Sequence, residues 1–384
     1  MAKEIFIKIF CENKLTRYIC FFIFLFINTL FSVKYFSRYT DFYIPATVLI
    51  DVMLVAIFAI KTDKIDAKIF SIFNYILLIV YLIFCIIIFQ IIDINSLHVD
   101  RWSVISSFWQ NFENGEYVYF AKSNEGNYPG PMPFYYILAY PFYFVKELGY
   151  FSMLGVPLFF LLLKYCKIEE GTQTKLLLLL LFSSFLWWEI MCRSNILLNS
   201  TLILFSIVYF FKEFPKFTTK KLIFSGILFG LLLSTRNVFA IAYIISCIFA
   251  LKIRYVSFKQ MFILAGIALC TFVGTFIPFV YGFWNEFLQM NPFIIQGSAL
   301  MPFSYTLIFI VLAIIFGFIC KKPTDVFFYI ALDLFLCIFT YSIYHICGNR
   351  LNEAFFGNIV DISYFILCIP FALFFYYKKI KECF

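Results

Sequence analysis

The sequence has few charged residues. Asp, Glu, Lys and Arg make up 14% of its 384 residues, whereas 63% are hydrophobic. A soluble globular protein carries about a quarter charged residues, so this deficit argues against an ordinary soluble protein and predicts an integral membrane protein. The net charge of +8 does not indicate nucleic-acid binding, because the basic residues lie in short clusters between apolar runs. Such clusters anchor loops to one face of a membrane.

Residue patterns typical of metal sites and disulfide frameworks are also scarce. The chain has two His, and its 12 Cys include no C-x-x-C pair. Because most of the Cys lie inside apolar runs, we interpret them as small apolar residues. We detect no internal repeat, whereas many transporters consist of two related halves. No segment has the composition of a separate soluble domain.

Long apolar runs, by contrast, occur along the whole chain. A transmembrane helix needs roughly 20 apolar residues. We therefore predict an all-α, polytopic integral membrane protein with about twelve transmembrane helices (range about 10–13). Residues 1–384 would form a single membrane domain. The expected spans are 18–33, 43–60, 69–92, 148–165, 175–191, 195–211, 221–235, 237–251, 258–282, 303–320, 324–344 and 359–377.

The distribution of basic residues predicts the orientation. If the amino terminus is cytoplasmic, most of the 30 Lys and Arg fall in cytoplasmic segments, as the positive-inside rule requires. Both termini are then cytoplasmic, and residues 93–147 form the largest outer-face segment. Within it, 134–145 is apolar but too short to cross, and a crossing there would reverse every later loop. We expect a re-entrant or interfacial helix at 134–145, and a second interfacial helix at 102–109.

With this topology, the unusual polar residues gather on the outer face. Asp100 lies directly after span 69–92, where a polar cluster is costly and often functional; its alternative role is to cap a helix that begins near Trp102. Arg236 lies between two apolar runs and must reach the interface or meet an anion. The gathered residues are His98, Asp100, Arg101, Glu113, Glu116, Glu189, Arg193, Arg236, Asn291, Gln296, His345, Arg350, Glu353 and Asp361.

Several of these charges have structural alternatives. Glu189 and Arg193 are four residues apart and could form an ion pair on one helix face. Arg350 and Glu353 could be ordinary loop charges. Inside the spans, we expect Asp51 and Asp333 to be hydrogen-bond partners between helices, in preference to a proton relay.

The polar residues and their spacing resemble the GT-C superfamily of polytopic glycosyltransferases, in particular its bacterial, polyprenyl-phosphate-sugar-dependent members. Asp100, in His98-Val99-Asp100-Arg101, matches the catalytic acidic residue that these enzymes carry in the first large outer loop. The Pro-rich, aromatic segment 128–136 looks like the segment that follows in many members. Segments 226–236 and 291–296 are also similar to bacterial members.

Two features depart from the family pattern. Many members have a paired acidic motif such as D-x-D, but this chain has a single Asp at that place. We therefore predict no cofactor; a divalent metal stays open, but no paired motif supports it. In addition, two spans precede the one that ends near Asp100, where many members have one.

The resemblance implies transfer of a sugar from a polyprenyl-phosphate-linked donor to a lipid-linked or cell-envelope glycan, on the outer face of the plasma (inner) membrane of a bacterium. Nucleic acid is not an expected partner. Asp100 would be the general base. The donor phosphate would bind to Arg236 first, and then to Arg193, Arg350 and His345. The expected substrate-binding residues are His98, Arg101, Glu113, Tyr128 and Gln296.

Two other functions stay open. A flippase or transporter of a lipid-linked glycan would also need many helices and a cationic cavity. An outer-face polysaccharide polymerase or ligase would use similar substrates, but such proteins typically depend on a large late outer loop. Here the largest outer loop comes early, which favours the glycosyltransferase.

Overall fold

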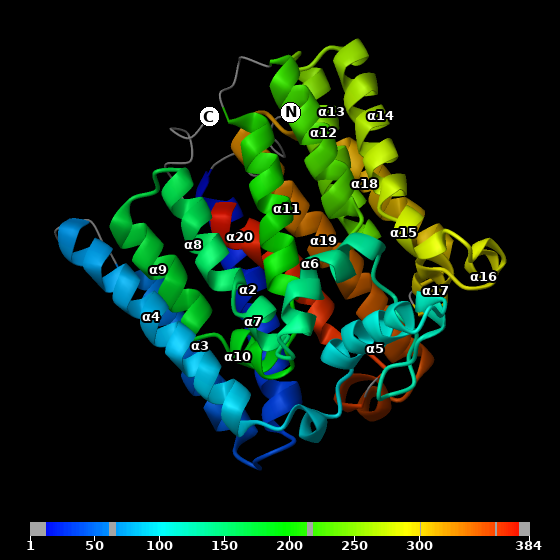
Figure 1. Ribbon diagram of the computed structural model, residues 1–384. Helices are drawn as coiled ribbons and strands as arrows, with labels where there is room; N and C mark the ends of the chain where they lie inside the picture. The colour runs from blue at the N-terminus through cyan, green and yellow to red at the C-terminus, as the bar shows by residue number, and fades with distance from the viewer. Residues whose placement is uncertain (1–12, 61–66, 213–217, 300, 358, 376–384) are drawn as a thin grey trace.

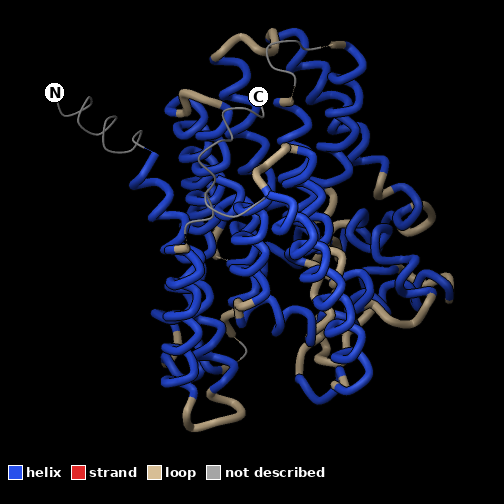
Figure 2. The backbone as a smooth tube through the Cα atoms, turned by 90° about the vertical axis from the view of Figure 1, so that its left-hand side faces the viewer, coloured by secondary structure: helices blue, strands red, loops and turns tan. Residues whose placement is uncertain are grey.

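The computed structural model describes residues 13–60, 67–212, 218–299, 301–357 and 359–375. Within these ranges the chain forms helices and loops and no β-strand (Figures 1 and 2). The prediction of an all-α fold is therefore confirmed for this part of the chain. The helices are α2 (Asn13–Phe36), α3 (Tyr43–Ala59), α4 (Ala67–Ile91), η1 (Ile94–Leu97), α5 (Arg101–Glu113), η2 (Val118–Phe120), α6 (Pro133–Phe144), α7 (Gly149–Ser152), α8 (Gly155–Tyr165), α9 (Glu170–Leu181), α10 (Ser184–Met191), α11 (Ile196–Phe211), α12 (Thr219–Leu233), η3 (Asn237–Phe239), α13 (Ala240–Lys252), α14 (Phe258–Gly274), α15 (Ile277–Val280), α16 (Trp284–Gln289), α17 (Pro292–Ala299), α18 (Phe303–Ile319), α19 (Pro323–Gly348), η4 (Asn352–Phe356), η5 (Ile362–Cys368) and α20 (Ile369–Phe375).

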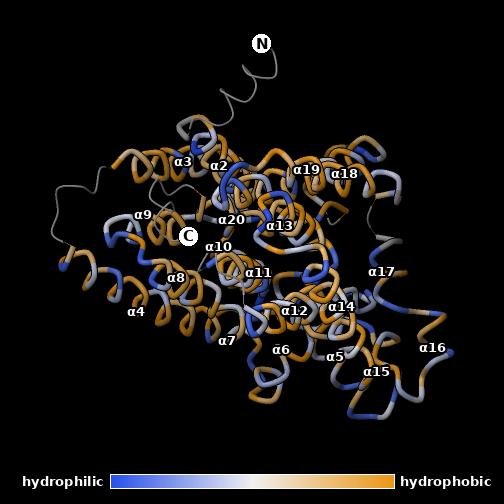
Figure 3. Tube along the Cα trace, turned by 90° about the horizontal axis from the view of Figure 1, so that it is seen from above, coloured by the Kyte–Doolittle hydropathy of each residue, from blue (hydrophilic) through white to orange (hydrophobic). Residues whose placement is uncertain are grey.

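The helices form a bundle with buried helices in the middle and exposed apolar helices at its edges. Figure 3 shows α11 and α20 inside a ring of other helices, and every residue of α20 is buried. At the periphery, α4 buries only Asn74, Tyr81 and Cys85, and α14 buries only Leu264. The exposed faces of these outer helices consist mainly of Ile, Phe, Leu and Val. Large exposed apolar surfaces are compatible with contact to lipid, as in a membrane protein.

The predicted number of about twelve spans is not confirmed. Four described helices are long and apolar enough to cross a membrane: Leu15–Phe36, Ala67–Ile91, Phe258–Val280 and Pro323–Gly348. The pair Glu170–Leu181 and Ser184–Met191, which bends by 61°, would be a fifth if it is one span.

The reason for the difference is that several apolar runs form short or interrupted helices. Run 148–165 divides into α7 and α8, and run 359–377 begins with the 3₁₀ helix η5. At about 1.5 Å per residue, α8 with its 11 residues is much shorter than the roughly 30 Å of a bilayer core.

The two helices expected in the outer segment are present as α5 and α6. They pack on each other through aromatic rings: Phe108 of α5 stacks on Tyr136 of α6 with ring centroids 3.7 Å apart. Phe279 of α15 meets Phe108 edge-on at 5.1 Å. These aromatic contacts form a second, smaller core, which holds α5 against α6 and α15 beside the bundle.

Close packing of α12 on α14 depends on two glycines. A Cβ atom added to Gly230 would lie 2.3 Å from the carbonyl oxygen of Ala268, and one added to Gly226 would lie 2.9 Å from Ile267. The small residues are four apart, so they share one face and let the helix backbones approach closely. The position of α12 in turn determines where Arg236 lies, just after its carboxyl end.

The two aspartates inside the bundle differ. Asp51 of α3 accepts hydrogen bonds from Asn28 Nδ2 at 2.9 Å and Thr29 Oγ1 at 2.7 Å, both on α2. The prediction of a helix-to-helix partner is confirmed there. Asp333 of α19 is fully buried, and neither of its carboxylate oxygens has a hydrogen-bond partner in the described part of the chain. For Asp333 that prediction is wrong.

Candidate functional site

Asp100 occupies the N-cap position of α5, but its side chain does not cap the helix. Its backbone carbonyl accepts from Val104 N at 2.9 Å, whereas the carboxylate makes no capping hydrogen bond. Instead, Oδ2 accepts from Asn127 Nδ2 at 2.7 Å and from Ser123 Oγ at 3.2 Å. The capping alternative is therefore wrong for the side chain. Among the described residues, none donates to Oδ1, so this oxygen can meet a ligand.

The next residue, Arg101, forms an ion pair with Asp361. Arg101 Nη2 lies 2.6 Å from each carboxylate oxygen, and the two side chains are 16% and 28% exposed. Burial alone would raise the pKa of Asp361, but the charge and hydrogen bonds of Arg101 lower it below its usual range. Burial opposes the charge on Arg101, and Asp361 raises the pKa of the guanidinium above its usual value. Both groups are thus ionised.

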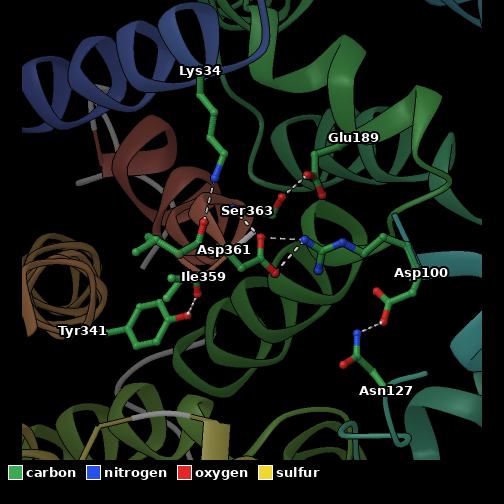
Figure 4. A network of polar contacts seen from close by, with 10 residues as sticks. Lys34, Asp100, Asn127, Glu189, Tyr341, Ile359, Asp361 and Ser363 are labelled. Atoms are coloured by element: carbon green, nitrogen blue, oxygen red, sulfur yellow. Dashed lines mark hydrogen bonds and ion pairs between the residues drawn. The ribbon is translucent and has the colours of Figure 1, made fainter. Parts of the chain in front are cut away.

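Asp361 belongs to the 359–363 segment, at which four other elements meet (Figure 4). Lys34 of α2 donates to the carbonyl of Val360 at 2.8 Å. Ser363 Oγ donates to Glu189 Oε1 of α10 at 2.6 Å. Tyr341 of α19 makes a longer contact, 3.5 Å, with the carbonyl of Ile359, and α5 contributes Arg101. Asp361 itself accepts from Ser363 N at 3.1 Å at the start of η5. The segment is therefore fixed from several sides.

Arg236 lies close to two aromatic rings and has no carboxylate partner in the described part of the chain. Its guanidinium carbon is 5.4 Å from the ring centroids of both Tyr135 and Tyr364. The residue is 8% exposed, and its Nε has no hydrogen-bond partner. Because arginine stays charged and a buried charge needs compensation, this arrangement favours binding of an anion.

Local backbone contacts explain why Tyr135 is next to Arg236. Helix α12 ends at Leu233, and the carbonyls of the next two residues serve as acceptors for the start of α6. Ser234 O accepts from Tyr135 N at 3.3 Å, and Thr235 O accepts from Met132 N at 3.3 Å. These hydrogen bonds join the chain directly after α12 to the outer segment.

The first turn of α6 lies within the electrostatic reach of both Arg236 and the start of α5. Burial raises the pKa of Tyr135, while the charges of Arg236 and Arg101 oppose this rise. Burial also raises the pKa of Tyr136, with Arg236 lowering it and Asp100 raising it. The Tyr136 hydroxyl is buried and has no hydrogen-bond partner among the described residues. Such unsatisfied polar groups are typical of places that hold water or a ligand.

The other predicted phosphate-binding residues have surroundings that differ from those of Arg236. Arg193 follows α10 and donates to Glu147 at 3.4 Å and to the carbonyls of Met191, Phe89 and Ile92 at 2.8, 3.1 and 3.3 Å. The alternative of an ion pair with Glu189 on one helix face is wrong, because α10 ends at Met191.

Arg350 and His345 lie near the carboxyl end of α19. The Arg350 side chain is 88% exposed and lies 4.0 Å from Glu353, as expected for loop charges. His345 is partly buried against Tyr341 and Tyr344, and its Nε2 has no hydrogen-bond partner among the residues that the structure describes.

The predicted substrate-binding residues are spread over the outer segment and α17. His98 is exposed and ends η1 in the left-handed conformation (φ 50°). Glu113 accepts from the hydroxyl of Tyr143 at 3.0 Å. The ring of Tyr128 lies 5.4 Å from Lys122 Nζ. Gln296 donates to the carbonyl of Gly130 at 2.6 Å and so joins α17 to the Pro-rich turn.

A surface hollow of about 440 Å³ lies beside the loop that holds Asp100. Lys122, which lines it, is followed by Ser123, one of the two donors to Asp100 Oδ2. The lining combines aromatic rings with carboxylate, amide and amine groups: Asn111, Glu116, Tyr117, Phe120, Ala121, Lys122, Phe283 and Glu286. Among the described residues, no group of three or more His, Cys, Asp and Glu is placed to hold a metal ion.

Sequence reasoning gave no role to several residues of this site. Tyr135 lies in the Pro-rich segment 128–136, but neither it nor Tyr364 stands out among the 26 Tyr of a chain with 57 Phe. Asn127 and Ser123 lie in a turn-rich loop, where such residues are ordinary. Asp361 was one of the polar residues grouped on the outer face, but its partner is 260 positions away.

No protein-family model, no curated protein and no solved structure matches this chain.

Proposed function

We propose that this protein is a membrane glycosyltransferase that moves a sugar from a polyprenyl-phosphate-linked donor to a glycan acceptor on the outer face of a bacterial plasma membrane. Asp100 acts as the general base, and Arg236 binds the donor phosphate. The support comes from the site rather than from relatives. Among the described residues, it combines a carboxylate with one oxygen that accepts no hydrogen bond, an arginine whose Nε has no partner, and a surrounding bundle with apolar faces.

The observation that carries the proposal is the environment of Arg236. Its Nε lacks a partner in the described part of the chain, and the rings of Tyr135 and Tyr364 each lie 5.4 Å from the guanidinium carbon. Keeping an arginine buried without a carboxylate is costly. A phosphate oxygen would supply the missing hydrogen bond and the missing charge together. The donor lipid would approach this position from the bundle, with its chain along the apolar helices.

In the proposed reaction, Asp100 acts on the acceptor and Arg236 acts on the donor. The acceptor hydroxyl gives its proton to Asp100 Oδ1, and its oxygen attacks the anomeric carbon of the donor sugar. The bond between that carbon and the phosphate oxygen breaks, and polyprenyl phosphate leaves with the bonding electrons. Arg236 stabilises the negative charge that develops on the leaving phosphate. Asp100 then releases its proton to water.

The acceptor would enter from the water-filled side, through the hollow beside Lys122. Its volume of about 440 Å³ lies within the roughly 300–1,000 Å³ typical of ligand sites. Tyr117, Phe120 and Phe283 offer aromatic surface, and Glu116, Glu286 and Asn111 offer hydrogen-bond acceptors for sugar hydroxyls. The hollow and the bundle would thus bring acceptor and donor to Asp100 from different directions.

The test is a transfer assay with purified protein in lipid vesicles and a set of radiolabelled polyprenyl phosphate sugars. We expect release of polyprenyl phosphate together with labelled glycan. Asp100→Asn should abolish transfer while donor binding persists, and Arg236→Met should weaken donor binding. Glu125→Gln, an exposed carboxylate of the same loop, and Arg254→Met, in the turn after α13, are the matched controls and should retain activity.

Each other outcome has a defined meaning. Full transfer by Asp100→Asn would remove Asp100 from the role of base. Unchanged donor affinity in Arg236→Met would remove Arg236 from the phosphate site. If the lipid-linked glycan crosses the vesicle membrane intact, without sugar transfer, the protein is a flippase or transporter. Transfer of a whole glycan chain rather than a single sugar would indicate a polymerase or ligase.

A further inference from the structure

Helix α5 carries Asp100 at its start but packs mainly on elements of its own outer segment, α6 and η2. Its first turn reaches the bundle through the side chain of Arg101. That side chain contacts both oxygens of Asp361 at 2.6 Å. Leu97 and Val99, just before Asp100, also pack on the apolar core of the bundle, and the Arg101–Asp361 contact adds a directional polar anchor directly after Asp100.

Asp361 is well suited to be a fixed anchor. Its own carboxylate accepts from Ser363 N, and the residues on either side are held by Lys34 through Val360 and by Glu189 through Ser363. Figure 4 shows Lys34, Glu189 and Asp100 on different sides of Asp361. A carboxylate fixed in this way can hold an arginine in one orientation, whereas a mobile surface carboxylate cannot.

The other contacts of Asp100 come from the exposed loop 123–127. Asn127 and Ser123 both donate to Oδ2, and no described residue donates to Oδ1. These two donors set the rotation of the carboxylate, but they belong to the same outer segment as α5. They cannot by themselves fix its distance to Arg236, which lies after α12.

We propose that Asp361 is a positioning residue: through Arg101 it fixes the start of α5 and so sets Asp100 at the correct distance and angle from the donor held by Arg236. This inference rests on the proposed glycosyltransferase function. It assigns a role to a residue 260 positions away from Arg101 that does not itself touch the substrate.

The decisive variant is the double replacement Arg101→Met/Asp361→Leu. It removes both charges of the pair together, so neither partner is left as an unpaired ion, and such apolar replacements are often neutral for stability. The matched control is Lys164→Met/Glu170→Leu, a pair of similar exposure with a 2.5 Å contact in another part of the chain. Both proteins should fold, as judged by size-exclusion chromatography and thermal unfolding.

Two readouts separate positioning from a merely structural role. First, kcat should fall about 10- to 100-fold in Arg101→Met/Asp361→Leu while the dissociation constant of the donor stays within about twofold, because Arg236 is intact. Second, spin labels at the exposed positions Gln110 and Ile343 should report a broader distance distribution. The label background replaces Cys270 and Cys347, which are exposed, and Cys11 and Cys383, which lie outside the described residues. The control pair should change neither readout.

A wild-type kcat or a wild-type distance distribution in Arg101→Met/Asp361→Leu would overturn the proposal. If that variant does not fold, the test uses Asp361→Glu, which keeps the charge but moves the carboxylate by one methylene. A wild-type kcat in Asp361→Glu would overturn the proposal. A reduced kcat with intact donor binding would support it. If the wild type transfers no sugar from any donor, the proposed function fails. The spin-label distances then still test whether Asp361 holds α5.

Discussion

Replacing Arg193 with Met removes a buried guanidinium that donates to four acceptors. Three of these are the carbonyls of Phe89, Ile92 and Met191, and the fourth is the Glu147 carboxylate. Since arginine has five N–H groups, little of its hydrogen-bonding capacity is left for a ligand. We therefore expect Arg193 to stabilise the fold by joining α4 to the end of α10, and not to bind the donor phosphate.

The expected magnitude follows from these contacts. A net contribution of about 1 kcal/mol per hydrogen bond, reduced because Glu147 can turn to water, gives a loss of about 3 kcal/mol for Arg193→Met. The assay is unfolding in mixed micelles with a rising fraction of denaturing detergent, followed by tryptophan fluorescence. Arg254→Met is the matched control, because Arg254 also follows a helix in the left-handed conformation, with φ 56° against 54°, but is exposed. It should change stability by less than about 0.5 kcal/mol.

A stable Arg193→Met protein with weakened donor binding would refute this reasoning and return Arg193 to the phosphate site. The expected pattern is the opposite: lower stability, with donor affinity unchanged in the fraction that is folded.

Two further predictions concern packing and pH. Gly230→Ala should destabilise the protein by about 1–3 kcal/mol, because the new Cβ would lie 2.3 Å from Ala268 O. Gly266→Ala is the control and should be neutral or stabilising, because the space around Gly266 is open. Equal effects of the two substitutions in the same unfolding assay would contradict close packing of α12 on α14. Because Arg101 lowers the pKa of Asp361, ionised Asp361 stabilises the fold above its unfolded pKa of about 3.9, and this contribution is lost as pH falls through the lower folded pKa. The stability difference between wild type and Asp361→Asn should therefore be constant from about pH 7 to 5 and shrink below about pH 4; a difference that already disappears near pH 6 would contradict it.

Much of the helix content could be predicted from the sequence, but helix length could not. Apolar composition marks the segments that become helices, and the expected helices at 102–109 and 134–145 appear as α5 and α6. Composition does not show where a run breaks. The interruption between α9 and α10 and the division of 148–165 arise where the chain turns within an apolar run. Because residues on both sides of such a turn are equally apolar, hydropathy carries no signal for it.

The sequence could predict only those residues of the candidate site whose charge is unfavourable beside or between apolar runs. Asp100 and Arg236 were found because a charge beside or between apolar runs needs an explanation. The Arg101–Asp361 pair joins residues 260 positions apart, and local sequence cannot indicate which of several outer-face carboxylates an arginine meets. The same limit applies to Arg193: spacing suggested Glu189, but the end of α10 at Met191 directs the side chain elsewhere.

Asp333 and Arg236 differ in how strongly each one argues for a ligand. Asp333 and Arg236 are both buried with polar atoms that lack hydrogen-bond partners among the described residues. A buried carboxyl group can become neutral by binding a proton, so its isolation costs less than that of a fixed charge and needs no ligand. Arginine has no such route, because its guanidinium stays protonated in proteins. The aromatic rings beside Arg236 provide some compensation, about 2 kcal/mol or more for a desolvated cation–π contact, but no hydrogen bond for Nε. For this reason Arg236, rather than Asp333, is the position at which an anionic substrate should be sought.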